Sequence, residues 1–345
     1  MKILSINTAD NNYEIRIERG SLENIGEIVS DALGLCRLCV VSDRNVAALY
    51  MDDVLHRFKS AGFDVCSFVI AGGEGSKTMS VANSLVEFLA EMGFGRTDMI
   101  AALGGGVVGD LAGFAASMFM RGIEYIQIPT TVLAALDSSV GGKTAVNLKE
   151  GKNLAGAFWQ PRMVICDPNA FGTLPREVYT AGLAEAIKCA VIADRHMFED
   201  FEVGSYDIDD VIARCIAIKA RLVEEDERDN GSRMLLNLGH SVGHAVEKCS
   251  DYEISHGEAV AIGLYAITKA GGNKRLIDRI YRTLAMNGLP WMCNIDKDAI
   301  LDAICFDKKR RNDRMSLVIP KNIGSCEIVE MPMEEALSYI EKGLE

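Results

Sequence analysis

Residues 98–116 read DMIAALGGGVVGDLAGFAA and decide the fold of the first half of the chain. An apolar run typical of a buried strand leads into a glycine-rich turn, and a helical pattern follows. Gly104, Gly106 and Gly109 fit G-x-G-x-x-G, in which glycines let the backbone approach a pyrophosphate at a helix N-terminus. A tight strand-to-helix turn without a ligand is the alternative. No obvious acidic residue follows at the spacing of a ribose contact, so Asp43, at the tip of an earlier strand, is the better candidate.

The same strand pattern recurs on both sides of this stretch. Apolar runs occupy residues 38–43, 65–70, 125–131 and 163–168, residues 14–18 alternate in polarity, and a helical pattern covers residues 80–94. Buried strands that alternate with helices predict an α/β domain with a parallel, Rossmann-like sheet covered by helices on both faces. Ligands of such sheets bind beyond the carboxyl ends of the strands.

Helical patterns dominate from about residue 176 onward, and the last strong strand candidate is MSLVIP at residues 315–320. Turn-forming residues at 168–176 separate the two halves. A chain of 345 residues also exceeds what one core usually serves. We therefore predict an α/β nucleotide-binding domain over residues 1–170 and an all-α domain over residues 171–345.

The composition argues against several partners. The net charge is −13, and no basic run suggests a nucleic-acid surface. No apolar run reaches the roughly 20 residues of a membrane helix. The start, MKILSINTAD, is too short and polar for a secretory signal, so we expect a cytoplasmic protein with no membrane partner. Cys36 and Cys39 match CxxC, but Cys39 reads as a strand residue and the ten cysteines lack a disulfide spacing.

Three of the five histidines, His240, His244 and His256, lie within 17 residues. On a helix, the first two share one face because they are four residues apart. The spacing resembles H-E-x-x-H, but Ser241 stands at the glutamate position, which disfavours a zinc protease. A catalytic metal takes three protein ligands and keeps an open position, so a carboxylate from elsewhere could complete the set.

Glu185 and Lys188 lie three apart in GLAEAIKCA, a helical pattern of otherwise small or apolar residues. Such a pair serves a function, or it lies solvated on an exposed edge. Upstream of the histidines, Arg233 and Asn237 are four apart and Asn237 is three before His240. One helix would align this cation, amide and imidazole, and ordinary surface ion pairing is the alternative.

Two further segments offer anion-binding residues. DSSVGGKT, residues 137–144, ends like a P-loop, but Asp137 occupies the position of the first glycine, which disfavours a nucleotide hydrolase. The segment still offers a glycine turn and Lys143, and EGKNLAG, residues 150–156, offers Lys152 and Asn153. An anionic substrate of this acidic chain would need such local cations.

Four long blocks resemble the 3-dehydroquinate synthase family. They are GGGVVGDLAGFAASMFMRGIEYIQIPTTVLAALDSSVGGKTAVNLKEGKNLAGAFWQP (104–161), TLPREVYTAGLAEAIK (173–188), DERDNGSRMLLNLGHSVGHAVE (226–247) and ISHGEAVAIGL (254–264). The resemblance runs from about residue 43 to residue 320. It implies an N-terminal α/β nucleotide-binding domain, a helical C-terminal domain that binds metal and substrate, bound NAD, one divalent metal (zinc, or cobalt) and a homodimer.

The reaction that the resemblance implies converts 3-deoxy-D-arabino-heptulosonate 7-phosphate to 3-dehydroquinate and phosphate, a lyase reaction and the second step of the shikimate pathway. NAD transiently oxidises an alcohol, which acidifies the neighbouring C–H bond, and the metal acts as Lewis acid. Phosphate elimination, re-reduction and an intramolecular aldol closure follow. The alternatives are another sugar-phosphate cyclase, acting on glucose 6-phosphate or sedoheptulose 7-phosphate, and a metal-dependent polyol or alcohol dehydrogenase of similar fold.

The resemblance also implies roles for single residues. It makes Glu185, His240 and His256 the metal ligands, and His244 a residue that contacts substrate or handles a proton. The implied substrate-binding or catalytic residues are Arg121, Asp137, Lys143, Asn153, Lys188, Lys219, Asp229, Arg233, Asn237 and either Lys308 or Lys309. The implied NAD-binding residues are Asp43, Asn45, Glu74, Lys77, Gly104, Gly105, Gly106, Val107, Asp110, Thr130, Thr131, Asp137, Lys143 and Lys152. Asp229 replaces the glutamate usual in the family's DERE segment, so its carboxylate is one methylene shorter.

Overall fold

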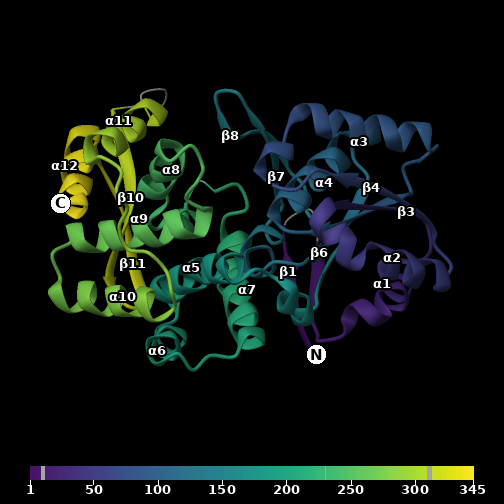
Figure 1. Ribbon diagram of the computed structural model, residues 1–345, viewed down its shortest axis with the longest axis horizontal. Coiled ribbons are helices and arrows are strands. Elements are labelled where there is room, and N and C mark those ends of the chain that lie inside the picture. The colour runs from purple at the N-terminus through teal and green to yellow at the C-terminus, as the bar shows by residue number, and fades with distance from the viewer. Residues whose placement is uncertain (9–11, 230, 309–312) are drawn as a thin grey trace. The chain divides into compact units, whose positions relative to one another are not determined.

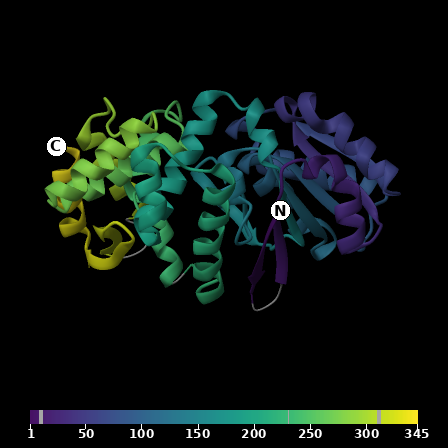
Figure 2. The same ribbon diagram turned by 90° about the horizontal axis from the view of Figure 1, so that it is seen from below.

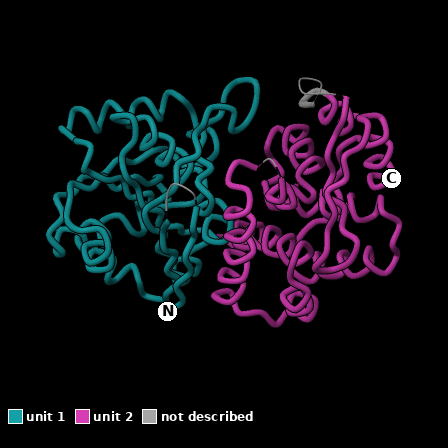
Figure 3. The backbone as a smooth tube through the Cα atoms, turned by 180° about the vertical axis from the view of Figure 1, so that it is seen from behind, with its two compact units in different colours: residues 1–174 teal, residues 175–345 magenta. Residues whose placement is uncertain are grey.

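A computed structural model describes residues 1–8, 12–229, 231–308 and 313–345. The described chain divides into two compact units, residues 1–174 and 175–345 (Figure 3). The short helix η5 (Pro168–Thr173) leads up to this division, and Asp167 caps its start by accepting a hydrogen bond from the backbone N–H of Asn169 at 3.0 Å. Each unit has its own set of elements.

Unit 1 contains a seven-stranded sheet in the order β1-β2-β9-β6-β5-β3-β4. Its strands are β1 (Lys2–Asn7), β2 (Asn12–Ile17), β3 (Arg37–Asp43), β4 (Asp64–Ile70), β5 (Met99–Gly104), β6 (Glu124–Pro129) and β9 (Met163–Cys166). Neighbouring strands are parallel except for β1, which lies antiparallel to β2 at the N-terminus (Figure 2). The predicted Rossmann-like sheet is confirmed, and the edge strand β1 makes it mixed.

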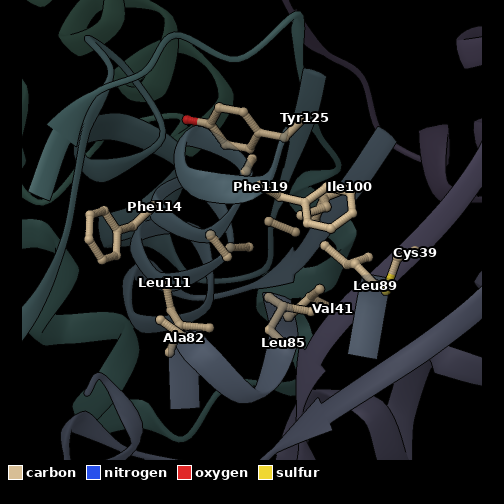
Figure 4. Packing of buried hydrophobic residues seen from close by; sticks show 14 of the residues in the cluster. Cys39, Val41, Ala82, Leu85, Leu89, Ile100, Leu111, Phe114, Phe119 and Tyr125 are labelled. Carbon is tan, nitrogen blue, oxygen red and sulfur yellow. The ribbon is translucent and has the colours of Figure 1, made fainter. Parts of the chain in front are cut away.

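Helices cover both faces of this sheet, because its strands are apolar on both sides (Figure 1). They are α1 (Ile25–Leu33), α2 (Arg44–Ser60), α3 (Met79–Glu91) and α4 (Gly106–Met118), with η1 (Ser21–Asn24), η2 (Glu74–Ser76), η3 (Phe119–Arg121) and η4 (Ala134–Ser138). Alternate strand residues enter different cores: Val41 packs with residues of α3 and α4, whereas Val40 packs with residues of α1 and α2. Figure 4 shows the first core, with Leu85 and Leu111 among its side chains.

The stretch that opens the sequence analysis forms the predicted strand, turn and helix. β5 ends at Gly104, Gly105 is the N-cap, and α4 begins at Gly106. A Cβ at position 104 would lie 2.7 Å from Val108, and one at position 109 would lie 2.4 Å from Oε1 of Gln127 on β6. Packing therefore requires glycine at position 104, whatever the turn binds, whereas at position 109 the end of the Gln127 side chain would have to move.

An antiparallel hairpin, β7 (Lys143–Leu148) with β8 (Gly151–Phe158), was not expected from the sequence. It stands out from the body of unit 1 in Figure 1. Most side chains of β8 are exposed or half-buried, so this strand lacks the continuous apolar run that marks a buried strand. The hairpin carries three residues with predicted roles in binding, Lys143, Lys152 and Asn153.

Unit 2 is mainly helical. Its helices are α5 (Arg176–Ala193), α6 (Arg195–Val203), α7 (Ile208–Glu225), α8 (His240–Cys249), α9 (His256–Ala270), α10 (Lys274–Met286), α11 (Lys297–Lys308) and α12 (Met333–Leu344), with η6 (Ser232–Asn237). The strand predicted at residues 315–320 lies in β10 (Arg314–Asn322), which pairs antiparallel with β11 (Ser325–Pro332). The helical character is confirmed, and this hairpin corrects the all-α description. β11 was missed because its side chains are mostly half-buried or exposed.

The helices and the cysteines of the described chain can be compared with the composition. Among the described residues, no helix is long and apolar enough to cross a membrane. All ten cysteines are free thiols, and Cys39 is a fully buried residue of β3. Its neighbour in the CxxC pair, Cys36, precedes the strand, so the strand interpretation of this segment is confirmed.

Candidate functional site

Glycines bring three helices of unit 2 into close contact. A Cβ on Gly263 of α9 would lie 2.1 Å from the carbonyl oxygen of Gly239, the N-cap of α8. A Cβ on Gly257 of α9 would lie 1.9 Å from the carbonyl oxygen of Ala181 on α5. The glycines beside the histidines are therefore explained by a neighbouring helix, which a larger residue would push away.

This packing brings together Glu185 of α5, His240 of α8 and His256 of α9. Each histidine is the first residue of its helix. Oε1 of Glu185 lies 3.5 Å from Nε2 of His240 and 3.4 Å from Nε2 of His256, and the three ligand atoms all lie within 4.8 Å of one another. Donor atoms about 2.1 Å from a tetrahedral ion lie about 3.4 Å apart, so this spacing fits a divalent metal such as zinc.

Glu185 is fully buried, which excludes a solvated pair on an exposed edge. Lys188, only 2% exposed, forms an ion pair with Oε2 of Glu185. Burial raises the pKa of Glu185, but Lys188 and both histidines outweigh burial and hold the pKa well below its ordinary value. Despite these ion-pair distances, neither carboxylate oxygen accepts a hydrogen bond of normal geometry from the described residues. An ionised carboxylate in this state is a suitable ligand for a divalent cation.

The histidines differ in their surroundings. Burial lowers the pKa of His240 well below its ordinary value, which favours the neutral ring that binds a metal. Burial also lowers the pKa of His256, but the nearby carboxylates of Glu185 and Glu247 outweigh it and raise the pKa to about 10. His244 is exposed, and its ring centre lies 5.2 Å from that of His240. The three imidazoles thus form one cluster in which His244 is open to solvent.

Glu247 was missed in the sequence. It lies on α8, is 2% exposed, and its Oε2 lies 3.1 Å from Nδ1 of His256. His244, Glu247 and His256 form a second group whose ligand atoms lie within 4.8 Å of one another. A signal was available, because a glutamate three residues after His244 and seven after His240 lies on the same helix face.

The segment before α8 differs from the prediction. η6 ends at Asn237, and the chain turns at Gly239, with φ of 79°, before α8 begins. The expectation that Arg233, Asn237 and His240 lie along one helix is therefore wrong, because the close approach of Gly239 to α9 requires a turn there. Arg233 is 1% exposed and donates from Nη1 to the carbonyl oxygen of Glu227 at 2.6 Å, which excludes ordinary surface pairing for this residue.

The turn that carries Asp229 has an unusual backbone. Oδ2 of Asp226 accepts hydrogen bonds from the backbone N–H groups of Gly231 at 2.6 Å and Arg233 at 3.2 Å, which ties the two sides of the turn together. Asp229 has a φ of 59°. Aspartate adopts this left-handed conformation more readily than most residues. The local backbone therefore suits aspartate better than the glutamate of DERE.

Three cations of unit 2 are buried. Lys188, Lys219 and Arg233 are 2%, 7% and 1% exposed. Lysine and arginine are almost never fully buried unless they are paired or bind a ligand. Lys309 lies outside the described residues, as does the side chain of Lys308 at the end of α11. Unit 2 thus buries three cations in a chain of net charge −13.

In unit 1, the predicted ribose contact Asp43 ends β3 and caps α2. Its Oδ1 accepts hydrogen bonds from the backbone N–H groups of Asn45 at 2.8 Å and Val46 at 3.2 Å, which fixes the carboxylate. A Cβ on Gly72 would lie 2.7 Å from Nδ2 of Asn45. Because β4, β3 and β5 are parallel neighbours, Gly72, Asp43 and Gly104 lie along one edge of the sheet, at the strands' carboxyl ends.

The glycine turn beside this edge fits a nucleotide phosphate. No described side chain forms a cap hydrogen bond at the N-terminus of α4, and the positive end of a helix in this state is suited to an anion. A Cβ on Gly105 would lie 3.1 Å from Thr131, and one on Gly106 would lie 3.0 Å from the hydroxyl of Ser138. Thr130, the residue after β6, contacts the turn, since its backbone N–H donates to the carbonyl oxygen of Gly104 at 3.0 Å. Val107, the next predicted contact, is half-buried on α4.

Lys77 connects a residue predicted to bind NAD, Asp110, with a residue predicted to bind substrate, Asn153. Its ammonium donates to Oδ2 of Asp110 at 2.5 Å and to Oδ1 of Asn153 at 2.6 Å. Asn147, which the sequence did not single out, extends this network. Its Nδ2 donates to Oε1 of Glu74 at 2.7 Å, and its Oδ1 accepts from the backbone N–H of Asn153 at 2.9 Å. The network thus connects η2, α4 and the β7–β8 hairpin.

The loop before the hairpin holds further predicted residues. Asp137 lies in η4, Lys143 begins β7 and Lys152 is the second residue of β8. The hydroxyl of Tyr13 on β2 accepts a hydrogen bond from the backbone N–H of Gly141 at 3.0 Å. A residue near the N-terminus therefore anchors the glycine turn that presents Lys143.

Six described non-glycine residues have a positive φ, and three of them are predicted substrate contacts. These are Arg121 at 70°, Asn153 at 56° and Asp229 at 59°. Such backbone costs free energy and clusters at functional sites. Asparagine and aspartate tolerate it, whereas arginine rarely adopts it. The next residue, Gly122, packs so closely that a Cβ there would lie 2.3 Å from Trp159.

Comparison with protein families and curated proteins agrees with these features. The 3-dehydroquinate synthase N-terminal family model matches residues 67–181, and the 3-dehydroquinate synthase C-terminal family model matches residues 182–310. The 3-dehydroquinate synthase of Lactococcus lactis subsp. cremoris (strain MG1363) is 40% identical over 358 residues, which cover 98% of this chain and 99% of the relative.

Two solved structures are also similar. One is 2-deoxy-scyllo-inosose synthase complexed with carbaglucose-6-phosphate, NAD+ and Co2+, with a TM-score of 0.88, 27% identity, and coverage of 99% of this chain and 100% of the other. The other is 2-epi-5-epi-valiolone synthase from Streptomyces hygroscopicus subsp. jinggangensis with NAD+ and Zn2+ bound, with a TM-score of 0.87, 26% identity, and coverage of 96% and 95%. On the family matches and the 40% identity, the chain belongs to the 3-dehydroquinate synthase family.

Proposed function

We propose that this chain converts 3-deoxy-D-arabino-heptulosonate 7-phosphate to 3-dehydroquinate and phosphate, and that it is therefore a carbon–oxygen lyase of the shikimate pathway. The observation that carries the proposal is the convergence of Glu185, His240 and His256 beside the buried ammonium of Lys188. Family membership supports the same activity, because curated relatives over nearly the full chain carry that name.

The metal, zinc or cobalt, would be held by Glu185, His240 and His256, whose donor atoms have the spacing of tetrahedral ligands. The ion would supply Lewis-acid polarisation of a substrate oxygen. Lys188 contacts Glu185 and adds positive charge at the same point, so an oxygen that becomes negative there is stabilised without reorganisation. His244, the exposed imidazole of the cluster, would contact the substrate or move a proton.

NAD would bind along the sheet edge of unit 1, with the pyrophosphate at the turn of residues 104–107 and the ribose at Asp43. It would supply a reversible oxidation that makes a neighbouring C–H bond acidic. Asp43 is held by two backbone amides, so its carboxylate keeps one orientation toward a ribose hydroxyl. The network around Lys77 fixes Asp110 and Asn153 before a ligand arrives. The remaining proposed NAD contacts are Asn45, Glu74, Thr130, Thr131, Asp137, Lys143 and Lys152.

The substrate carries a carboxylate and a phosphate, which need charge-assisted hydrogen bonds. Lys219 and Arg233 are buried cations of unit 2, and burial strengthens their interaction with an anion. The other proposed substrate-binding or catalytic residues are Arg121, Asp137, Lys143, Asn153, Lys188, Asp229, Asn237 and one of Lys308 and Lys309. These residues would bind and orient the substrate, which is the main task the protein has in this reaction.

We also propose a cytoplasmic homodimer, with residues 1–170 as the NAD-binding domain and residues 171–345 as the metal- and substrate-binding domain. Light scattering at micromolar concentration checks the oligomeric state. One chain has a mass of 37.5 kDa, and a dimer has twice that mass. A monomer of 37.5 kDa in solution would contradict the proposal.

The deciding experiment supplies NAD, Zn2+ and the heptulosonate phosphate, and follows released phosphate and NADH absorbance together. Formation of phosphate and 3-dehydroquinate without accumulating NADH is the expected result. Stoichiometric NADH without phosphate would instead identify a dehydrogenase. No reaction with the heptulosonate phosphate, together with turnover of glucose 6-phosphate or sedoheptulose 7-phosphate, would identify another sugar-phosphate cyclase.

A further inference from the structure

We propose that Glu247 is a positioning residue that orients His256, so that Nε2 of this ring, and not Nδ1, faces the metal. The inference rests on the metal site of the proposed function. Oε2 of Glu247 lies 3.1 Å from Nδ1 of His256, while Nε2 of the same ring lies 3.4 Å from Oε1 of Glu185. The ring therefore bridges two buried carboxylates, one through each nitrogen.

The two distances have different chemical meanings. A separation of 3.1 Å lies within the range of an N–H···O hydrogen bond. Two donor atoms that share a tetrahedral ion lie about 3.4 Å apart, which matches the Nε2 side of His256 and its contact with Glu185. Glu247 thus accepts a hydrogen bond from Nδ1–H, and Nε2 is the nitrogen that would give up its proton and bind the ion. This separates the two overlapping groups: Glu185, His240 and His256 hold the ion, and Glu247 supports them.

The link between α8 and α9 fixes both partners of this hydrogen bond. The carbonyl oxygen of Glu247 accepts hydrogen bonds from the backbone N–H of Tyr252 and the hydroxyl of Ser250, both at 2.9 Å. At the other end, Ser255 forms a capping box with Glu258, whose Oε2 accepts from the backbone N–H of Ser255 at 2.9 Å. His256 follows directly as the first residue of α9. The short connection between α8 and α9 therefore fixes the positions of the His256 ring and the Glu247 carboxylate relative to each other.

A carboxylate that accepts the second N–H of a ligating imidazole fixes its tautomer and orientation and increases its basicity. Loss of such a partner lowers metal affinity by about 10–100-fold. Glu247 is 2% exposed, so water does not readily replace it. Because an amide oxygen can still accept from Nδ1 but carries no charge, we expect about 10-fold weaker binding for Glu247→Gln and up to about 100-fold for Glu247→Ala.

The test is a titration of the metal-free full-length protein with Co2+, which reports affinity and ligand geometry through its visible absorption. The matched control is Glu258→Gln, which removes a carboxylate two residues after His256 from the capping box. We expect the control to bind Co2+ within about twofold of the unmodified chain, and both Glu247 variants to bind more weakly with the absorption bands unchanged. Circular dichroism of each metal-free variant checks its folding, and the isosteric glutamine variant keeps the test valid if the alanine variant does not fold.

Two outcomes would overturn the inference. Unchanged Co2+ affinity of the folded glutamine variant would show that Glu247 does not support the ligand. Altered absorption bands would show that Glu247 is itself a ligand, as in the group with His244. Failure of the unmodified chain to bind Co2+ would instead refute the metal site of the proposed function, so the two failures are distinguishable.

Discussion

Replacing Gly257 by alanine adds one methyl group at the contact between α9 and α5. Its Cβ would lie 1.9 Å from the carbonyl oxygen of Ala181 and 2.5 Å from the carbonyl carbon. Both atoms belong to helix backbone, so the clash cannot be relieved by turning a side chain. The two helices must move apart, and Glu185 and His256 lie on opposite sides of this contact.

The required movement follows from these distances. A carbon and an oxygen in contact lie about 3.3 Å apart, so the helices must separate by about 1.4 Å. A similar increase in the 3.4 Å distance between Glu185 Oε1 and His256 Nε2 would take the pair beyond the span of one tetrahedral ion. Overpacking of this kind costs about 1–3 kcal/mol of stability. A displacement of about 1 Å at a site of fixed geometry can cost about 100-fold in function.

The assay is a Co2+ titration of the metal-free variant together with urea unfolding. We expect the free energy of unfolding to fall by about 1–3 kcal/mol and Co2+ affinity to fall by about 100-fold. Gly172→Ala is the control, because a Cβ there has no atom within 4 Å and its backbone needs no positive φ. This control should keep both properties.

The reasoning would be refuted if Gly257→Ala kept the unfolding free energy and Co2+ affinity of the unmodified chain. The glycine would then be unnecessary for the close approach of α5 and α9. A loss of stability with unchanged Co2+ affinity would refute only the link between this contact and the ligand spacing.

Three other substitutions test separate parts of the structure through its stability. Lys188→Met should destabilise the metal-free protein by about 3 kcal/mol, because it leaves the buried carboxylate of Glu185 without its ammonium partner, and Co2+ should restore part of this stability. Urea unfolding with and without Co2+ checks this, and an equal loss of stability in both states would contradict it. Asp229→Glu should cost about 1 kcal/mol in urea unfolding because of the positive φ, and no loss would show that the backbone relaxes. Burial raises the pKa of Asp194, but its hydrogen bond with Arg214 outweighs burial and lowers the pKa in the folded state. The pair therefore stabilises the fold above the unfolded pKa of about 3.9, and this stabilisation is lost as pH falls through the lower folded pKa. Asp194→Asn should therefore be less stable than the unmodified chain at pH 7 by about 0.5–1 kcal/mol, a solvent-screened value, with the difference shrinking below about pH 4, and a constant difference would exclude the ion pair as its cause.

Long-range packing decided which parts of the fold could be predicted. The strands at residues 38–43 and 163–168 are buried on both faces, so their apolar runs were sufficient. β8 and β11 are stabilised by pairing with a neighbour while many of their side chains stay exposed, and no local pattern reveals this. The turn at Gly239 was missed because it depends on α9, which begins 17 residues later.

The residue types of the candidate metal site were predictable, and Glu247 could have been placed on the same helix face, but its contact with His256 was not predictable. Two histidines four apart suggested a shared face, and the family pattern separated His240 from His244. The hydrogen bond between Glu247 and His256 depends on the connection from Ser250 to Ser255, whose backbone includes two non-glycine residues with positive φ. Sequence reasoning places residues on a helix face, but it does not show how two helices meet.

Charge at the candidate site explains why a second carboxylate lies beside it. His240 and His256 each begin a helix, and each helix N-terminus carries about half a positive charge. Lys188 adds a full positive charge, so a divalent cation would meet repulsion that Glu185 alone does not offset. Glu247 supplies the second negative charge through the ring of His256. With both carboxylates ionised and the cation bound, the cluster keeps a net positive charge, which favours an anionic substrate in a chain whose overall charge is −13.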